Sequence, residues 1–430
     1  LGGTDPVTPD TLMMIGSTTK SFTTLLMAIL VDEGVITWDT PVVDILPSFA
    51  LQDPEVTQQI TVRNLVCACS GVPRRDLEWV FNSNTAEGII ESLAEYALFT
   101  DFGEAFQYSN QLVASGGYIA ALAAGGEYGD LAQAYLDVMQ ARVFDPLGMT
   151  DTTFSFDTVA ASDNYALPHG ATLLGEYVAS PLTLEAVLTQ VAPAGSLWSN
   201  ANDMARYLIT QLNRGVTPEG ERIVSAENLE LTWEPQVSVS ADMQYGLGWL
   251  VEDYDGLQLI HHGGNTFGFT SDLAFLPEVG VGIVVLTNAR GSNLFNEAVR
   301  ERFFELLFDQ ESDMQATIDF ALKSGEEALA EIQAQLQPSL DKEVITPYLG
   351  TFSNDLLGDI TLSLDGERLI MDAGEFTSEL RAGIDDEGET YYILIDPPLA
   401  GIPLDLVESE AGVPTIQIDI VTDVYTFTRP

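Results

Sequence analysis

The sequence predicts a mixed α/β (α+β) protein, in which helices pack on an antiparallel sheet and a small all-β barrel follows. Three observations predict this class. Helical and strand periodicities mix over residues 1–310, with the strand signals clustered late. Residues 311–342 are acidic and rich in alanine and glutamine, which is typical of a helical linker. Residues 343–430 alternate in short runs, as in a small barrel or sandwich.

Within the first region, 1–310, helices are predicted where apolar residues recur every three or four positions, and strands where they alternate. The predicted helices are 17–33, 111–124, 130–143, 202–213 and 293–308, and the predicted strands are 247–252, 257–262, 270–276 and 281–288. Pro277-Glu278-Val279-Gly280 separates the last two strands, which indicates a hairpin.

The last region, 343–430, contains eight short alternating runs with Gly, Asp or Pro between most of them. The runs are 348–353, 359–364, 367–372, 376–382, 390–395, 402–408, 414–420 and 423–428. So short a barrel has little room for a cavity. We therefore expect this domain to shape the mouth of an active site or to form a contact in a homo-oligomer. The alternative is that the barrel binds a ligand.

The composition excludes several partners. Among the 430 residues, 65 are acidic and 16 basic, which gives a net charge of −49. Such a surface repels nucleic acid and anionic membranes and suits a salty medium, where screening relieves self-repulsion. No apolar run reaches the roughly 18–20 residues of a membrane span. No signal peptide is visible, and we expect an extracellular or periplasmic protein, with a cytoplasmic one as the alternative.

The two cysteines, Cys67 and Cys69, flank a single residue. A disulfide across one residue would be strained, so buried free thiols are the expectation. Two thiols with no nearby histidine cannot complete a zinc site, and the sequence indicates neither a metal nor a cofactor.

Ser17-Thr18-Thr19-Lys20 opens the first predicted helix, whose apolar stripe begins at Phe22. A serine at a helix N-terminus lies where the dipole stabilises negative charge, and Lys20 follows one turn later on the same face. A lysine with a lowered pKa can accept the hydroxyl proton. The alternative is an ordinary N-cap with a surface lysine. Ser339-Leu340-Asp341-Lys342 repeats the spacing, but it follows Pro338 and opens no apolar helix, which is typical of a linker.

Tyr108-Ser109-Asn110 precedes another apolar helix, so the triplet lies on a loop at a helix start. A nearby lysine ammonium would lower the pKa of Tyr108, which could then act as base or acid. Asn110 could offer its amide to a substrate. The alternative is that Ser109 or Asn110 caps the helix while Tyr108 packs.

His262-Gly263-Gly264-Asn265 ends an apolar strand, where two glycines would let a substrate approach the backbone closely. The N–H groups of Asn265 and Ser17 could together form an oxyanion hole. The alternative for His262 is a packed residue at a strand end. Its neighbour His261 should face the other side of the sheet, and His169 is interpreted as structural.

This ordered set resembles the serine beta-lactamases and penicillin-binding proteins, and their class C-like branch of esterases and D-stereospecific peptidases. Other matching stretches are Val7-Thr8-Pro9-Asp10-Thr11, Ile60-Thr61-Val62-Arg63-Asn64-Leu65, Pro146-Leu147-Gly148-Met149-Thr150, Tyr245-Gly246-Leu247-Gly248-Trp249 and Val284-Val285-Leu286-Thr287-Asn288. The tail resembles the lipocalin-like domain of some members. The resemblance implies acyl transfer: Ser17 attacks a carbonyl, Lys20 and Tyr108 move protons, Asn110 holds the substrate amide, and strand edge 262–265 binds the acyl portion.

Three departures from the family pattern bear on function. The family has two sheet strands ahead of the Val7 stretch, so we expect a sheet without them. His262 stands where true beta-lactamases have lysine, and a neutral imidazole attracts a substrate carboxylate less. Cys67-Ala68-Cys69-Ser70-Gly71 replaces a His-Thr-Ser-Gly stretch.

The resulting expectation is a serine hydrolase that cleaves ester or amide bonds of a small molecule or peptide. The alternatives are a beta-lactamase and a non-catalytic penicillin-binding or sensor protein. A metallohydrolase and an α/β-hydrolase are disfavoured, because His-Glu-x-x-His and Gly-x-Ser-x-Gly are missing.

Overall fold

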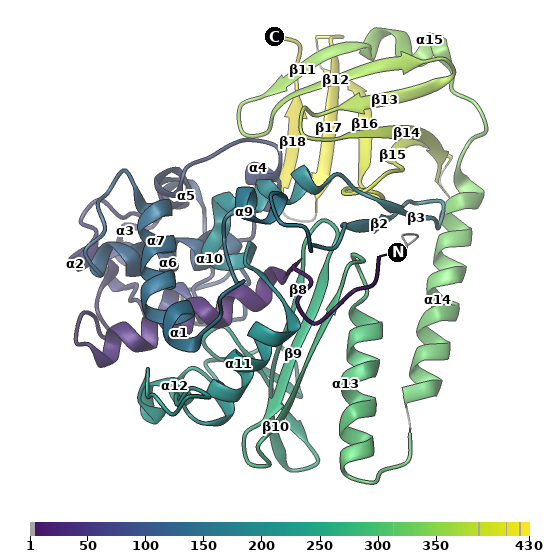
Figure 1. Cartoon of the computed structure of the whole chain (residues 1–430). Helices are drawn as coiled ribbons and strands as arrows, with labels where there is room; N and C mark the ends of the chain where they lie inside the picture. The colour runs from purple at the N-terminus through teal and green to yellow at the C-terminus, as the bar shows by residue number, and fades with distance from the viewer. Residues whose placement is uncertain (1–4, 313, 386–387, 410, 421–422) are drawn as a thin grey trace. The chain divides into compact units, whose positions relative to one another are not determined.

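The computed structural model describes residues 5–312, 314–385, 388–409, 411–420 and 423–430. The chain divides into two compact units (Figure 1). The first unit comprises the chain up to Asp76, Asn84–Ala166 and Glu185–Phe308. The second comprises Leu77–Ser83, Leu167–Leu184 and the chain from Asp309 onward.

The first unit is built on an antiparallel six-stranded sheet in the order β10-β9-β8-β7-β6-β5. The strands are β5 (Val237–Ser238), β6 (Met243–Tyr245), β7 (Leu250–Tyr254), β8 (Leu257–Asn265), β9 (Thr270–Leu276) and β10 (Val281–Thr287). Strand β9, next to edge strand β10, is buried along its whole length, both in its polar half, Thr270-Ser271-Asp272, and in its apolar half, Leu273-Ala274-Phe275-Leu276. The hairpin predicted between β9 and β10 is confirmed, with Val281 opposite Leu276.

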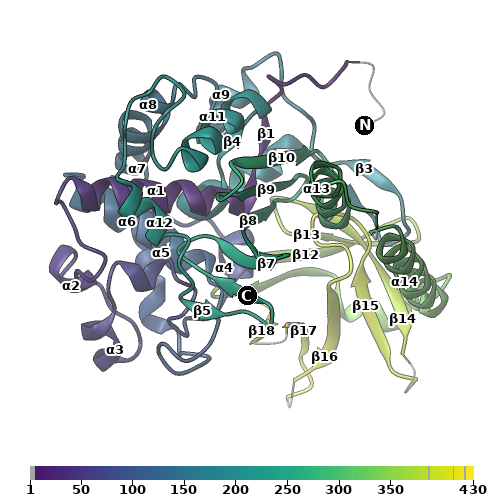
Figure 2. The same ribbon diagram turned by 90° about the horizontal axis from the view of Figure 1, so that it is seen from below.

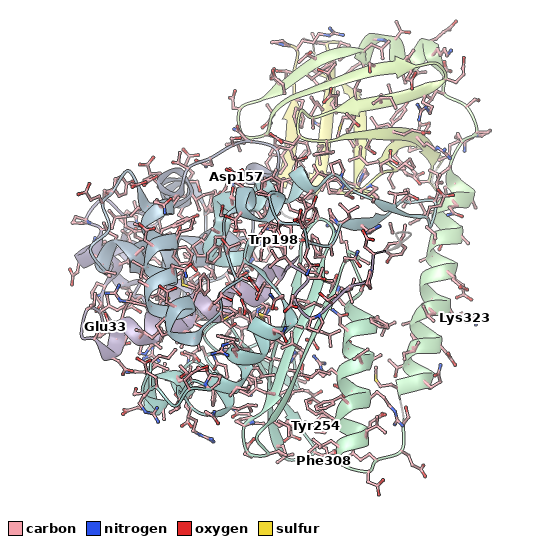
Figure 3. All side chains as sticks on the ribbon, in the orientation of Figure 1. Glu33, Asp157, Trp198, Tyr254, Phe308 and Lys323 are labelled. Atoms are coloured by element: carbon pink, nitrogen blue, oxygen red, sulfur yellow. A yellow bond between two sulfur atoms is a disulfide. The ribbon has the colours of Figure 1, made fainter. Side chains whose placement is uncertain are left out.

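Helices cover both faces of this sheet (Figure 2). On one face, Phe304 of α13 (Asn293–Leu307) packs against Leu259 and Leu276. At the lower end of the same sheet, Tyr254 and Phe308 lie with ring centroids 6.1 Å apart (Figure 3). On the other face, α11 (Ala201–Leu212) meets β10. Strand alternation separates the two faces, because side chains of adjacent residues point in opposite directions.

A helical part on the α11 side carries the functional segments. Its two long helices are α1 (Thr19–Asp32) and α6 (Asn110–Ala123). The other helices are α2 (Val42–Ile45), α3 (Pro54–Gln59), α5 (Ala86–Ser92), α7 (Leu131–Met139), α8 (Asp145–Leu147), α9 (Phe156–Ala160), α10 (Ala192–Gly195) and α12 (Ala226–Leu231). Helix α4 (Asp76–Val80) begins in the first unit with Asp76, and its remaining residues belong to the second unit. Short 3-10 turns are η1 (Gly16–Thr18), η2 (Arg63–Leu65), η3 (Leu93–Glu95) and η5 (Leu182–Val191), and η4 (Gln140–Phe144) is a π-helical turn. Strands β1 (Met13–Met14) and β4 (Trp198–Ser199) pair beside them.

The second unit contains an eight-stranded antiparallel sheet whose strands pair in chain order. They are β11 (Gly350–Asn354), β12 (Gly358–Asp365), β13 (Arg368–Asp372), β14 (Thr377–Ile384), β15 (Thr390–Leu394), β16 (Pro403–Glu408), β17 (Pro414–Ile420) and β18 (Asp423–Phe427). A bridge between Ser353 and Thr428 nearly closes the sheet into a barrel. Its inward side chains, such as Phe352 and Ile418, are fully buried, so they fill the interior.

The remaining elements of the second unit are α14 (Met314–Gln335), α15 (Lys342–Ile345), η6 (Thr346–Tyr348), β2 (His169–Ala171) and β3 (Tyr177–Ala179). The β2–β3 hairpin joins the barrel unit through Leu173. Its N–H donates to the carbonyl of Ile395 over 2.8 Å, and its side chain packs with Ile393. In the described part of the chain, no helix combines the length and apolar character that a bilayer crossing requires.

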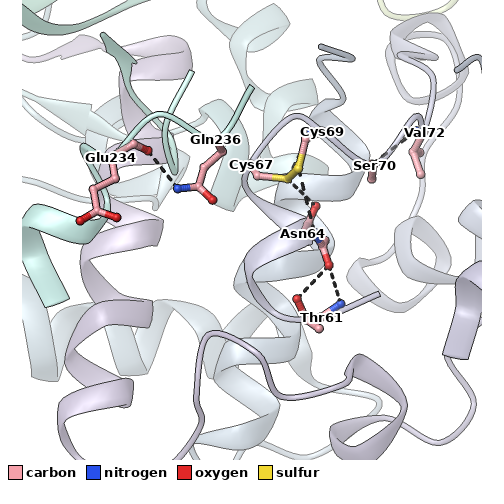
Figure 4. The surroundings of a disulfide bond; sticks show 8 residues. All are labelled: Thr61, Asn64, Cys67, Cys69, Ser70, Val72, Glu234 and Gln236. Carbon is pink, nitrogen blue, oxygen red and sulfur yellow. Dashed lines mark hydrogen bonds between the residues drawn. A yellow bond between two sulfur atoms is a disulfide. The ribbon is translucent and has the colours of Figure 1, made fainter. Parts of the chain in front are cut away.

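The prediction of free thiols is wrong. Cys67 and Cys69 form a disulfide with their Cα atoms 5.2 Å apart (Figure 4). The intervening Ala68 adopts a left-handed conformation with φ of +52°, and this turn brings the two cysteines within bonding range. The prediction of burial is confirmed, since both side chains lie in the interior.

Candidate active site

Ser17 lies where the start of α1 meets the end of strand β8, and two glycines allow this close approach. Gly16 has φ of +53°, and a Cβ there would lie 2.6 Å from the backbone nitrogen of Asn265. A Cβ on Gly264 would lie 1.9 Å from the carbonyl oxygen of Ile15. Any side chain at either position would push the helix start away from the strand. The Ser17 turn and the Asn265 backbone are therefore direct neighbours.

Hydroxyl groups fasten this junction. Thr18 Oγ1 donates to the carbonyl of His262 over 3.1 Å and lies 2.8 Å from Ser271 Oγ. Ser271 Oγ donates in turn to the carbonyl of Ile15 over 2.7 Å. These hydrogen bonds are buried, so the loss of either partner would leave an unsatisfied polar group in the interior and destabilise the fold. They hold the first turn before α1 in register with strands β8 and β9.

Lys20 is completely buried and surrounded by oxygen atoms. Its Nζ lies 3.0 Å from Ser17 Oγ, 2.8 Å from Asn110 Oδ1 and 2.7 Å from the carbonyl of Ala194. Burial holds the pKa of Lys20 well below its ordinary value. The charge of Arg74 lowers this pKa further, whereas that of Asp76 raises it. The balance favours a neutral amine beside the Ser17 hydroxyl.

Tyr108 closes the site from the loop before α6. Lys20 Nζ lies 4.7 Å from the centre of its ring, and the His262 ring centroid lies 6.4 Å away. The predicted lowering of the Tyr108 pKa is wrong. Burial raises this pKa, and the hydrogen bond with the Ser17 side chain and the charge of Arg74 offset only part of the effect. Tyr108 is thus a protonated phenol next to Ser17.

Asn110 occupies the first position of α6, and its amide links two charged groups. Its Oδ1 accepts from Lys20, while its Nδ2 donates to both carboxylate oxygens of Asp76 over 3.0 and 3.1 Å. Ser109 caps the helix, as the alternative interpretation of this triplet expected. A role for the Asn110 amide in holding substrate stays a prediction.

Arg74 and Asp76 were missed by sequence reasoning. They form an ion pair, and the Arg74 guanidinium lies 5.6 Å from the centre of the Tyr108 ring. Ser109 Oγ donates to the carbonyl of Pro73 over 3.1 Å, which aligns this loop with the start of α6. The Val72-Pro73-Arg74-Arg75-Asp76 stretch matches no motif, so only the fold brings it to the site.

His262 is 4% exposed, and its ring lies beside the rings of Tyr108 and Tyr245. Its Nε2 lies 3.2 Å from the hydroxyl of Tyr245, a second residue that sequence reasoning did not place here. Its Nδ1 lies 2.6 Å from the carbonyl of Gly263. These partners fit a neutral ring that donates from Nδ1 and accepts at Nε2. Burial and the nearby Lys20 lower its pKa to about 3.

The other residues of the strand edge have distinct surroundings. Gly263 is half-buried, and a Cβ there would meet only the carbonyl of Ser271 at 3.6 Å. The Asn265 side chain donates to Asn293 over 2.8 Å and accepts from Thr270 over 3.1 Å. Its backbone can therefore face Ser17 while its side chain is anchored elsewhere.

The remaining histidines and the second Ser-x-x-Lys copy lie outside this site. His261 points to the opposite sheet face, as predicted, where it contacts Glu252 and Arg300. His169 belongs to β2 in the second unit. Lys342 forms an exposed ion pair with Glu367 instead of approaching Ser339.

An antiparallel sheet with a Ser-x-x-Lys helix start docked on its glycine-lined strand defines the beta-lactamase and penicillin-binding-protein class of fold. Residues 1–306 match the family model described as Beta-lactamase. The chain therefore belongs to the beta-lactamase family.

Three comparisons illustrate its relatives. The chain is 26% identical over 394 residues to "Unguisins hydrolase ungD'" of Aspergillus campestris, covering 85% of this chain and 71% of that one. It is 28% identical over 316 residues to "Penicillin-binding protein 4" of Amycolatopsis lactamdurans, covering 70% and 78%. The solved structure of the octameric penicillin-binding protein homologue from Pyrococcus abyssi matches with a TM-score of 0.61 and 21% identity, over 98% and 89% of the two chains. That last similarity concerns the fold alone. These relatives support a serine hydrolase in general terms.

Proposed function

We propose that the protein is a serine hydrolase that cleaves ester or amide bonds through an acyl-enzyme on Ser17. The observation that carries the proposal is the buried amine of Lys20, 3.0 Å from the Ser17 hydroxyl. A neutral amine can donate two hydrogen bonds, to Asn110 Oδ1 and to the Ala194 carbonyl. Its lone pair is then free to accept the Ser17 proton.

The reaction follows from the positions of these groups. Ser17 Oγ adds to the substrate carbonyl as its proton passes to Lys20. The resulting oxyanion is stabilised by the N–H groups of Ser17 and Asn265, at the positive end of α1. The proton returns through Tyr108 to the leaving oxygen or nitrogen as its bond to carbon breaks. Water then attacks the acyl-enzyme, loses its proton to the same groups, and frees Ser17 and a carboxylic acid.

The surroundings of His262 favour esters and peptides over beta-lactams. A neutral imidazole offers no full charge to the carboxylate that penicillins carry. The similarity to a protein named as a hydrolase of unguisins supports a hydrolytic activity. The alternative of a beta-lactamase draws on the match to a penicillin-binding protein. The third possibility is a sensor protein that has this fold but does not turn over a substrate.

The test is labelling with a fluorophosphonate probe, followed by peptide mapping. We expect one adduct on Ser17 in the wild type, none in Ser17→Ala, and full labelling in Ser339→Ala, the matched serine of the linker copy. Label on Ser339 or on no residue would contradict the proposal. Hydrolysis of short p-nitrophenyl esters should exceed that of nitrocefin, and the reverse ranking would favour a beta-lactamase.

A further inference from the structure

The amide of Asn110 has one orientation that satisfies both of its neighbours. With Oδ1 toward Lys20 and Nδ2 toward Asp76, every contact pairs a donor with an acceptor. An ionised carboxylate can only accept, so a flipped amide would oppose oxygen to oxygen at Asp76. It would also remove the acceptor of the Lys20 amine. Asp76 is thus the group that decides which end of the amide Lys20 meets.

Asp76 is itself held in place. The residues on either side of Arg74 are hydrogen-bonded to the start of α6. Ser109 Oγ donates to the Pro73 carbonyl, and Gln111 Nε2 donates to the Arg75 carbonyl over 2.6 Å. Asp76 keeps only 20% of its side chain exposed. Its place relative to Asn110 is therefore built into the fold, and Arg74 is its counter-ion.

The two charges of this pair act on Lys20 in opposite directions. Asp76 stabilises the ammonium form and Arg74 destabilises it. The other groups that face Lys20 are Ser17, Tyr108, His262, Asn110 and the Ala194 carbonyl. Tyr108 and His262 are both neutral near pH 7, so the Arg74–Asp76 pair supplies the charge around Lys20.

We propose that Asp76, with Arg74 as its counter-ion, is a positioning residue for acylation: it locks the Asn110 amide so that the Lys20 amine keeps its lone pair on Ser17. The inference rests on the proposed function. It adds a carboxylate–amide–amine chain, from Asp76 through Asn110 to Lys20, to the Ser17 site. Neither Asp76 nor Arg74 touches the reacting atoms.

The test measures the second-order rate of fluorophosphonate labelling of Ser17 against pH. Asp76→Asn removes the charge but keeps an acceptor, and we expect the acidic limb of the profile to move to lower pH. Arg74→Gln should move it to higher pH. Asp76→Ala also frees the Asn110 amide, and its plateau rate should fall by about 10–100-fold, because displaced catalytic groups cost that much.

Controls separate this result from a general effect of charge or folding. Glu33 and Arg142 form an ion pair away from the site in the same unit, so Glu33→Gln and Arg142→Gln should leave the profile unchanged. Arg74 is 56% exposed, so its replacement should not impair folding. If the wild type is labelled at Ser17 but the pH profiles of Asp76→Asn and Arg74→Gln shift in the same direction, or do not shift, this inference alone is overturned. A wild type that is not labelled at Ser17 would overturn the proposed function and this inference with it.

Discussion

At the residue scale, burial disfavours the charged forms of two ordinarily basic side chains. Lys20 and His262 both lie inside the site, and transfer from water to the interior disfavours their charged forms. Hydrogen bonds replace the lost solvation: Lys20 meets two oxygen acceptors, and His262 meets Tyr245 and Gly263. The lowered pKa of Lys20 favours the free amine, which can accept a proton, while His262, with a pKa of about 3, does not titrate near neutral pH.

The labelling rate of Ser17 should therefore rise with pH through the pKa of Lys20 alone. Because only the free amine accepts the hydroxyl proton, and burial lowers this pKa, the rise should occur well below the pH at which an exposed lysine titrates. With its pKa at about 3, His262 stays neutral throughout this range. The measurement is the pH profile of fluorophosphonate labelling in the wild type and in His262→Gln. A profile that loses its acidic limb in the variant would assign that limb to His262.

At the element scale, periodicity predicted the helices and strands that carry the site. The predicted helix at 17–33 begins two residues later, at Thr19, because Gly16–Thr18 form a 3-10 turn. Ser17 and Lys20 still meet, since side chains three residues apart align in such a turn. The contact between Asp76 and Asn110 could not be predicted, because it joins the first residues of two helices, α4 and α6, that are 34 residues apart in the chain. Nor could the disulfide, which depends on the left-handed backbone of Ala68.

The docking of the α1 start on β8 can be tested with adjacent glycines. Gly264→Ala would place a methyl group 1.9 Å from the Ile15 carbonyl, whereas Gly263→Ala meets only an ordinary contact at 3.6 Å. We expect Gly264→Ala to destabilise the protein by about 1–3 kcal/mol, the usual cost of overpacking. It should also slow labelling of Ser17. Urea denaturation of both variants is the measurement, and equal loss of stability would argue against this close approach.

At the scale of the whole molecule, the sequence predicted a barrel because its strands alternate so regularly. Their pairing in chain order confirms that prediction. The inclusion of 77–83 and 167–184 in the second unit carried no local signal, since it depends on contacts such as that of Leu173 with Ile395. The likeness of the barrel to lipocalins stays a prediction.

The excess of acidic side chains should make stability depend on salt. Pairing every basic side chain with an acidic one would still leave 49 negative charges, whose mutual repulsion opposes the compact state. Raising the salt from about 0.1 M to 1 M shortens the screening length from about 10 Å to 3 Å, so the melting temperature near pH 7 should rise. At roughly pH 4, where many carboxyl groups are protonated, the same addition should have a smaller effect. Calorimetry at the two pH values is the measurement. An equal increase at both would point to a general salting-out effect instead, because that mechanism does not require charged carboxylates.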